Sequence, residues 1–326
     1  MKIRRRIKVL IVVVALVLVG IALYSGLQML ESTVLRKGET VEETQPSKTV
    51  TSDGIDYFPR QDITTLLIMG IDETGPVRDS MSYNNEGESD VVLLAIFDDT
   101  EKTYNVVALN RDTMVELPIL GLGGKRAGTK VAQLALAHTY GSGLHDSCEN
   151  VKETITALLG GDFIDYYLSM NMDAIPILND AVGGVSVTVT DDFGEVDTGI
   201  HVGEMTLQGQ QALNFVQIRK DVGTQMNVSR MERQKEYMYG FVEALDSKLE
   251  NSSSFVFETY ESVSPYIVSD CSVNTLSLLV SRFSEYEMDD VITPEGENIM
   301  GDGFMEFYLD KEQFEELILG LFYSPK

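Results

Sequence analysis

Several residue types that carry common chemistry are scarce in, or absent from, this 326-residue chain. It has two cysteines and three histidines, and their spacing matches no zinc-binding pattern. No glycine-rich fingerprint for binding a nucleotide is present, and no serine lies in the elbow motif of the α/β-hydrolases. These absences exclude zinc-dependent, nucleotide-dependent and serine-hydrolase chemistry of the familiar kinds.

Basic residues are also scarce. The chain has 25 Lys and Arg against 51 Asp and Glu, a formal net charge of −26. Five of the basic residues stand within the first eight positions, so the remainder holds 20 basic and 51 acidic residues, a net charge of −31. A surface this acidic repels a nucleic-acid backbone, so we expect no nucleic-acid partner. An anionic substrate would require the few arginines to gather at one place, or a metal ion.

Residues 9–30 form a stretch of 22 residues without a charge. At a rise of about 1.5 Å per residue, such a helix spans roughly 33 Å, enough to cross the hydrocarbon core of a bilayer. The basic residues 1–8 predict a cytoplasmic N-terminus and place the rest of the chain outside the cell membrane. A cleaved signal peptide is the alternative, but its apolar core would be shorter and a small-residue cleavage site should follow.

The expected organisation continues with a polar juxtamembrane linker at 31–60 and a main domain at 61–250. Residues 251–326 either complete the same domain or form an extension. Cys148 and Cys271 suit an oxidising compartment, where they could form one disulfide. The alternative is a pair of buried free thiols.

Short apolar runs bounded by turn residues predict the strands of the main domain. They lie at 62–72, 90–98, 103–110, 165–171, 184–190, 212–220 and 304–310, and the acidic turn "DDTEK" joins the second and third as a hairpin. If 212–220 is a strand, Phe215, Gln217 and Arg219 share one of its faces.

Apolar spacing predicts helices at 129–141, 148–159, 229–249, near 273–287 and at 311–322. Asp146 or Ser147 is the expected cap of the second helix, the glycines at 160–161 its end, and Ser229 the cap of the third. Strands and helices mixed at this density predict an α/β fold: a central mixed β-sheet with helices on both faces, preceded by one transmembrane helix.

Acidic and basic side chains stand at the ends of the predicted strands. Asp72 ends the first strand, Asp90 begins the second, and Arg111 and Asp112 follow the third. If these strands are neighbours, their ends converge on one edge, where open α/β sheets bind ligands. Further along the chain, Arg219 ends a predicted strand, and the basic and amide residues Arg230, Arg233 and Gln234 open the next helix.

This set of side chains suits phosphoryl transfer. Two carboxylates can hold Mg²⁺ or Mn²⁺, and arginines bind phosphate oxygens in a bidentate manner and stabilise their developing charge. Each residue also has an ordinary interpretation as a turn residue, a structural ion pair or a solvated helix face. Composition and spacing alone therefore indicate an anchored extracytoplasmic α/β domain with a candidate phosphate site.

A resemblance to a known family adds to this interpretation. The segments "LLIMGID", "ESDVVLLAIFD", "VVALNRDTMVELP", "KVAQLALAHTYG", "NDAVGGVSVTV", "LQGQQALNFVQIRK" and "SRMERQ" occur in the order found in the LytR–CpsA–Psr family, over about residues 62–245. The resemblance implies transfer of a glycopolymer phosphate, a teichoic acid or capsular polysaccharide, from a polyprenyl pyrophosphate carrier to peptidoglycan in Gram-positive bacteria. It also implies an apolar pocket for the lipid and a magnesium-assisted pyrophosphate site.

The resemblance also implies roles for particular residues. By position, Asp72 and Asp90 match the metal-binding carboxylates, and Arg111 matches a pyrophosphate-binding arginine with Asp112 beside it as orienter or base. Arg219 matches the second arginine of an Arg-x-Arg motif. The helix-start residues Arg230 and Gln234 match pyrophosphate-binding positions.

Two departures distinguish this chain from the family pattern. Glu88 lies two residues before Asp90 where an arginine is common, and Gln217 replaces the first arginine of the Arg-x-Arg motif. The basic residues Arg78, Lys130 and Lys220 could compensate. The resemblance then implies a divergent subgroup, which either retains transferase activity or binds a lipid-linked glycan without catalysis, as a scaffold or sensor.

Overall fold

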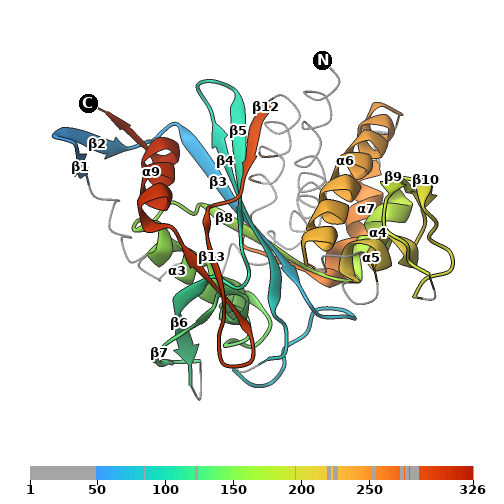
Figure 1. The fold of residues 1–326 in the computed structure, drawn as a ribbon, viewed down its shortest axis with the longest axis horizontal. Coiled ribbons are helices and arrows are strands. Elements are labelled where there is room, and N and C mark those ends of the chain that lie inside the picture. Colours follow the sequence, from blue (N-terminus) through green and yellow to red (C-terminus); the bar gives the residue numbers. More distant parts are fainter. Residues whose placement is uncertain are drawn as a thin grey trace, which may run out of the picture. The chain divides into compact units, whose positions relative to one another are not determined.

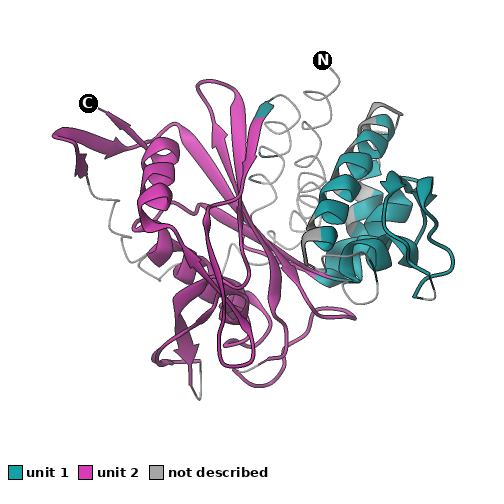
Figure 2. Cartoon of the chain, in the orientation of Figure 1, with its two compact units in different colours: residues 1–35, 172–266, 272–288 teal, residues 36–171, 267–271, 289–326 magenta. Residues whose placement is uncertain are grey.

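A computed structural model describes residues 49–83, 85–121, 124–194, 196–218, 222, 227–251, 255–271, 275, 279 and 286–325. The predicted transmembrane stretch 9–30, most of the linker 31–60 and most of the helix expected near 273–287 lie outside these residues. Within the described ranges, no helix combines the length and hydropathy needed to cross a bilayer. Two compact units are distinguished: residues 36–171, 267–271 and 289–326 form one, and residues 172–266 and 272–288 belong to the other (Figure 2).

The central sheet has six strands within the described residues, in the order β11-β8-β3-β4-β5-β12 (Figure 1). β3 runs parallel to β8 and antiparallel to β4, and β4 and β5 form the predicted hairpin, so the prediction of a mixed sheet is confirmed. The strands are β3 (Ile63–Ile71), β4 (Ser89–Asp98), β5 (Thr103–Leu109), β8 (Tyr166–Asn171), β11 (Ile267–Ser269) and β12 (Glu287–Ile292).

Two helices, α3 (His145–Leu159) and α9 (Lys311–Phe322), pack on one face of this sheet and share its hydrophobic core. Leu67 of β3 pairs with Leu94 of β4, which pairs with Val107 of β5, and all three side chains are buried. Apolar residues of α3 and α9 complete the same hydrophobic cluster (Figure 1). Burial of this apolar surface is the main force that holds the strands in register.

The ends of these two helices follow from local chemistry. α3 ends where predicted because Gly160 adopts a left-handed conformation with φ of 71°, which glycine tolerates at little cost. Its predicted caps are wrong: Leu144 is the N-cap, and the Asp146 carboxylate accepts hydrogen bonds from the backbone and hydroxyl of Ser142. α9 has the predicted bounds, and the Asp310 side chain caps its start.

The helix predicted over 129–141 is wrong. Residues Arg126–Gln133 form β7, which pairs with β6 (Met114–Leu120), and a short 3₁₀-helix, η1 (Leu134–Ala137), follows. Val131, placed on the buried face of the predicted helix, is 64% exposed. The helical spacing of apolar residues was therefore a coincidence across two elements, and pairing with β6 satisfies the backbone in place of helical hydrogen bonds.

Smaller sheets complete this unit. β13 (Gly296–Met300) and β14 (Met305–Leu309) form a hairpin, which confirms the strand predicted at 304–310. β1 (Val50–Ser52), β2 (Ile55–Pro59) and β15 (Tyr323–Pro325) form a three-stranded sheet, so the ends of the unit meet. Both cysteines are buried free thiols, which is the second of the two alternatives.

The other unit consists mainly of helices. It contains α4 (Ala174–Ala181), the antiparallel strands β9 (Val185–Val189) and β10 (Gly203–Leu207), α5 (Gln210–Gln217), α6 (Asn227–Asn251), α7 (Phe255–Val263) and the 3₁₀-helix η2 (Ser264–Tyr266). β9 and α6 confirm the strand predicted at 184–190 and the helix predicted at 229–249, although Ser229 lies inside α6.

The strand predicted over 212–220 is wrong, because residues Gln210–Gln217 are helical. Its buried residues Ala212, Leu213, Phe215 and Val216 recur with the three- and four-residue spacing of a helix face. The predicted common face of Phe215, Gln217 and Arg219 therefore does not exist as a strand face. Arg219 itself lies outside the described residues.

Candidate functional site

The ends of β3, β4 and β5 converge at one edge of the sheet, as the sequence predicted. The register of β4 with β5, continued by two residues, sets Asp90 opposite Arg111. The register of β3 with β4, continued by one residue, sets Asp72 opposite Glu88, and the Asp72 amide donates a hydrogen bond of 2.8 Å to the Glu88 carbonyl. Two strand pairings thus bring together four residues from three separate segments of the chain.

A β-bulge lies at the centre of this edge. Gly70 of β3 pairs with Val91 and Ile71 pairs with Ser89, so the register shifts here and Asp90 is the extra residue of β4 at the bulge. Bulges bend a strand and redirect the side chains beside them. Here the bulge falls on the residue whose carboxylate contacts Arg111.

Arg111 is surrounded by carboxylates. Its Nη1 forms an ion pair with Asp90 Oδ1, its Nη2 with Glu88 Oε2, and its Nε lies 3.6 Å from Asp112 Oδ1. The side chains of Arg111, Asp90 and Asp112 are only 16%, 11% and 14% exposed, whereas Glu88 is 37% exposed. We call these four residues the Arg111 cluster; its formal charge is −2, and Glu88 is its most accessible member.

The turn that carries Arg111 and Asp112 is held from several sides. Gln133 Nε2 donates a hydrogen bond of 2.7 Å to Asp112 Oδ1, and the Asp112 amide donates to Asn110 Oδ1 at 2.9 Å. The Asp112 carbonyl accepts a hydrogen bond of 2.9 Å from the amide of Phe307 in β14. The Asp112 carboxylate is therefore fixed relative to the guanidinium of Arg111, as an orienting residue requires.

The loop before Glu88 is fixed by a buried amide and a buried imidazole. Asn85 Nδ2 donates to the carbonyls of His138 and Gly141, both at 2.8 Å, and its Oδ1 accepts from the Gly87 amide at 2.7 Å. His138 Nδ1 lies 2.9 Å from the Gly87 carbonyl, which can only accept, so Nδ1 carries the proton. Burial lowers the pKa of His138, which favours the neutral ring, and the hydrogen bond that it donates holds the carbonyl directly before Glu88.

The remaining residues predicted for this site are more peripheral. Asp72 is exposed directly after β3, and Arg78 is exposed in the loop that follows. Lys130, on β7, has its Nζ 3.4 Å from the Tyr140 hydroxyl and 6.0 Å from the centre of that ring. In the described part of the chain, neither Arg78 nor Lys130 forms an ion pair with the Arg111 cluster, and their roles stay predictions.

Three residues near the site were not found from the sequence. Glu88 was noted only as a departure, and no pattern paired Gln133 with Asp112, because Gln133 lay in a predicted helix. Glu73 is the third: its carboxyl group packs against Gly87, where an added Cβ would lie 2.9 Å from Glu73 Cδ. Burial raises the pKa of Glu73, and the positive charge of Arg78 opposes that rise.

The predicted residues of α6 belong to the other unit and have structural partners there. Gln234 Nε2 donates a hydrogen bond of 3.0 Å to the Val216 carbonyl at the end of α5. Arg233 pairs with Asp191 at 2.9 Å and donates to the Ile218 carbonyl, and Arg230 is buried. These contacts tie α6 to the end of α5, and a pyrophosphate-binding role for Arg230 and Gln234 stays a prediction.

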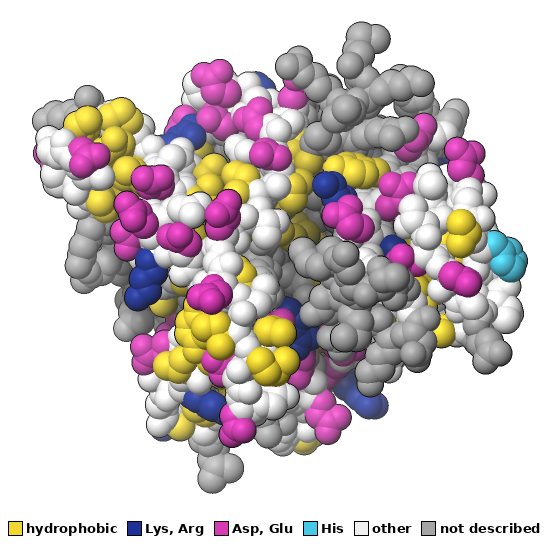
Figure 3. Space-filling model, in the orientation of Figure 1, with side chains coloured by type: hydrophobic (Ala, Val, Ile, Leu, Met, Phe, Trp, Pro, Cys, Tyr) yellow, Lys and Arg dark blue, Asp and Glu magenta, His cyan; other side chains and the backbone are white. Residues whose placement is uncertain are grey.

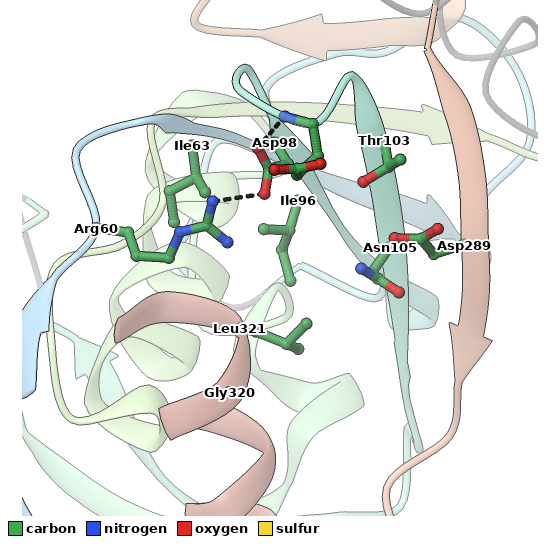
Figure 4. Close-up of a pocket in the computed structure, with 10 residues that line it drawn as sticks. Arg60, Ile63, Ile96, Asp98, Thr103, Asn105, Asp289, Gly320 and Leu321 are labelled. Atoms are coloured by element: carbon green, nitrogen blue, oxygen red, sulfur yellow. Dashed lines mark hydrogen bonds and ion pairs between the residues drawn. The ribbon is translucent and has the colours of Figure 1, made fainter. Parts of the chain in front are cut away.

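A cavity of about 350 Å³ opens at the opposite end of the sheet (Figure 4). Asp98, at its rim, is eight residues along β4 from Asp90, or about 27 Å at a strand's rise. Arg60 donates hydrogen bonds to both Asp62 and Asp98, and its bond to Asp62 lowers the pKa of that carboxyl to about 2. The lining is Arg60, Ile63, Ile96, Asp98, Glu101, Thr103, Asn105, Asp289, Gly320 and Leu321. Arg60 is the one cation among the described residues of this lining, and Asp62 and Asp98 neutralise its charge, so the cavity does not suit a phosphate.

Acidic side chains are also spread over the visible face of the molecule, and Lys and Arg are few there (Figure 3). No group of three or more His, Cys, Asp or Glu side chains with metal-binding geometry occurs among the described residues. The strand-end edge is therefore the better candidate for phosphate chemistry, because it alone combines the predicted carboxylates with Arg111.

Comparison with known proteins decides the family. The profile of the LytR_cpsA_psr family matches residues 24–319, nine-tenths of the chain. The chain belongs to the LytR_cpsA_psr family. The resemblance inferred from the strand-end motifs is thereby confirmed, and it extends beyond residues 62–245 into the C-terminal segment.

Curated relatives carry consistent names. The chain is 26% identical over 284 residues to the polyisoprenyl-teichoic acid–peptidoglycan teichoic acid transferase TagU of Enterococcus faecalis, covering 85% of this chain and 81% of that protein. It is 27% identical over 190 residues to the transferase TagV of Bacillus subtilis, covering 56% of this chain and 44% of that protein. For that and several other relatives, the chain spans about half of the relative's length.

Solved structures share the fold. A protein of Streptococcus agalactiae has a TM-score of 0.63 at 23% identity, covering 79% of this chain and 87% of that one. The structure of Bacillus subtilis TagV has a TM-score of 0.59 at 22% identity, covering 80% of this chain and 96% of that one. The α/β architecture of this family is therefore present here.

Proposed function

We propose that this chain transfers a glycopolymer phosphate from a polyprenyl pyrophosphate carrier to peptidoglycan. Membership of the LytR_cpsA_psr family supports this, as do relatives named teichoic acid transferases. The polymer is a teichoic acid or a capsular polysaccharide. The protein is anchored in the cell membrane by residues 9–30 and acts on its outer side.

The observation that carries the proposal is the position of Arg111. Its guanidinium is fixed at the strand-end edge by Asp90 and Asp112, with its remaining Nη2 edge turned to the accessible Glu88. A planar guanidinium held in this way binds two phosphate oxygens and stabilises the charge that develops on them. In the proposed reaction a peptidoglycan hydroxyl attacks the phosphorus that bears the glycopolymer, and the bond to polyprenyl phosphate breaks.

The hydroxyl must lose its proton in that step. Asp112 is the candidate base, because its carboxylate lies beside Arg111 and Gln133 holds it in place. Arg219, Arg230 and Gln234 are proposed to contribute to pyrophosphate binding, with Arg78 and Lys130 as additional cations at the periphery.

A divalent cation fits the donor set of this edge. Asp72 and Asp90 offer carboxylate oxygens, which Mg²⁺ and Mn²⁺ prefer, and the Arg111 cluster has an excess of two negative charges that a dication would balance. Mg²⁺ or Mn²⁺, when bound, would polarise the pyrophosphate and neutralise its charge. We propose that Asp72 and Asp90 hold this ion.

The proposal is tested by turnover of a defined substrate. The purified full-length protein in detergent is mixed with a polyprenyl pyrophosphate-linked saccharide, Mg²⁺ and peptidoglycan fragments, and release of polyprenyl phosphate is followed. Arg111→Gln should lower the rate by about 100-fold, since it removes a charged transition-state contact. Arg126→Gln is the matched control, because Arg126, on β7, forms an exposed ion pair with Glu153 of α3. Equal rates for both folded variants would refute the mechanism.

One observation favours a second candidate function. Because Arg111 is already paired with carboxylates, the chain could bind a lipid-linked glycan without transferring it, as a scaffold or sensor. Saturable binding of the same substrate by wild-type protein, with no release of polyprenyl phosphate, would select this alternative.

A further inference from the structure

We propose that Glu88 is a specificity-determining residue that competes with the phosphate ligand for Arg111, so that ligand binding must displace it. The inference rests on the proposed function, since it concerns the same site.

The guanidinium of Arg111 is already occupied on all sides. Each of the three nitrogens of Arg111 faces a carboxylate, and Nη2 is the one that faces Glu88. Asp90 and Asp112 approach the other two from β4 and from the neighbouring turn. A phosphate can therefore reach Arg111 in bidentate fashion only where a carboxylate gives way.

Glu88 is the carboxylate that can leave Arg111 most easily. Asp90 is 11% exposed and Asp112 is 14% exposed and hydrogen-bonded to Gln133, so neither can leave without breaking buried contacts. Glu88 is 37% exposed and has the longer side chain, and its carboxylate has water available on leaving. Its backbone nevertheless stays in place, because the Gly87 carbonyl and the Asp72 amide hold the loop on either side. The Glu88 side chain can therefore move away from Arg111 while its backbone stays fixed.

The net charge of the Arg111 cluster also depends on the residue at position 88. With Glu88 in place, a phosphate ligand meets a cluster of net charge −2, and with glutamine there the net charge is −1. An arginine at this position would change the charge to 0 and add a second donor of bidentate hydrogen bonds. Affinity for an anionic ligand should therefore rise in the order Glu, Gln, Arg.

The test measures binding, not turnover. The full-length protein in detergent is titrated with inorganic pyrophosphate in the presence of Mg²⁺ by calorimetry. Glu88→Gln should bind about tenfold more tightly than wild type, as expected when a competing charged contact is removed, and Glu88→Arg more tightly again. Glu86→Gln and Glu86→Arg are the matched controls, because Glu86 lies two residues away in the same loop, is exposed and changes the net charge equally. They should alter affinity by less than about twofold.

A double variant shows that the effect depends on Arg111. In an Arg111→Gln background, Glu88→Gln should no longer increase affinity, whereas a general charge effect would persist. Thermal unfolding of each variant separates a folding defect from a binding effect, and Glu88→Ala replaces any variant that does not fold.

The outcomes separate the two proposals. If wild type and the Glu88 variants bind pyrophosphate with equal affinity, Glu88 is not a competitor, and the proposed function stands. If affinity for pyrophosphate rises equally in the Glu86 and Glu88 variants, the competition is refuted, and the change in net charge alone explains the increase. If no variant binds pyrophosphate, the proposed function fails, and this inference fails with it.

Discussion

The ion pairs of the Arg111 cluster should differ in strength according to their burial, and double-mutant cycles can measure this order. The perturbations are Arg111→Gln, Asp90→Asn and Glu88→Gln, singly and in pairs. Arg111→Gln leaves three carboxylates without their common cation and should cost about 2–4 kcal/mol, below the upper range for a fully buried pair because the cluster reaches solvent.

The coupling energies follow from the exposed fractions. Asp90 and Arg111 are 11% and 16% exposed, so their pair is little screened by water and should couple by about 1–3 kcal/mol. Glu88 is 37% exposed, so its coupling to Arg111 should resemble that of a surface pair, at most about 1 kcal/mol. The smaller term is what allows Glu88 to act as the displaceable partner.

Urea unfolding of the full-length protein in detergent provides the measurement. Because the chain has no tryptophan, far-UV circular dichroism is the appropriate signal. In 1 M salt the Glu88–Arg111 coupling should fall to near zero, while the Asp90–Arg111 coupling should persist, since salt screens exposed charges most strongly. A Glu88 coupling equal to or larger than the Asp90 coupling would refute the assignment of roles within the cluster.

Three further predictions concern the rest of the molecule. Cys148 and Cys271 should not react with a thiol reagent at pH 8 until the protein is unfolded, when two thiols should titrate, because burial raises the pKa of each to about 12; a titre of zero would indicate a disulfide. Gly240→Ala should lower stability by about 1–3 kcal/mol in thermal unfolding, because an added Cβ would overlap the backbone of β9; an unchanged midpoint would contradict the close approach of α6. Arg60→Gln should flatten the loss of stability between pH 4 and pH 2. Arg60 lowers the pKa of Asp62 to about 2, so its ion pair stabilises the fold fully above the pKa of the unfolded chain, and this stabilisation is lost as the pH falls through the folded value. An acid titration that matches wild type would disprove the ion pair.

The strands of the sheet core could be predicted because each buries both faces. β3 and β4 are continuous apolar runs that end at polar residues, a pattern that fits a buried strand and little else. α9 could be predicted to the residue, since Asp310 supplies a capping side chain and the apolar spacing is regular. In these elements, local sequence and tertiary burial favour the same structure.

The two wrong predictions, the helix over 129–141 and the strand over 212–220, have a common physical cause. β7 and α5 are each only eight residues long, so their apolar residues fit the spacing of a strand and of a helix almost equally well. Pairing with β6 decided the first, and a buried helix face decided the second. Neither partner is visible from a short window of sequence.

The candidate site could be predicted in outline but not in its charge balance. That Asp72, Asp90 and Arg111 meet at one edge follows from strand ends alone, given neighbouring strands. The contact of Glu88 with Arg111 depends on the bulge at Asp90 and on the buried His138 hydrogen bond, and both are properties of the folded loop. A one-residue shift in strand register leaves no recognisable signature in this sequence.

The charge of this edge depends on single side chains, whereas the fold that forms it does not. The fold matches solved structures at 22–23% identity, so strand pairing tolerates wide substitution. On that fold, one glutamate places a third carboxylate on Arg111. Under the competition proposed for Glu88, an anionic ligand reaches Arg111 only by displacing this carboxylate, so its affinity depends on the charge at this one position.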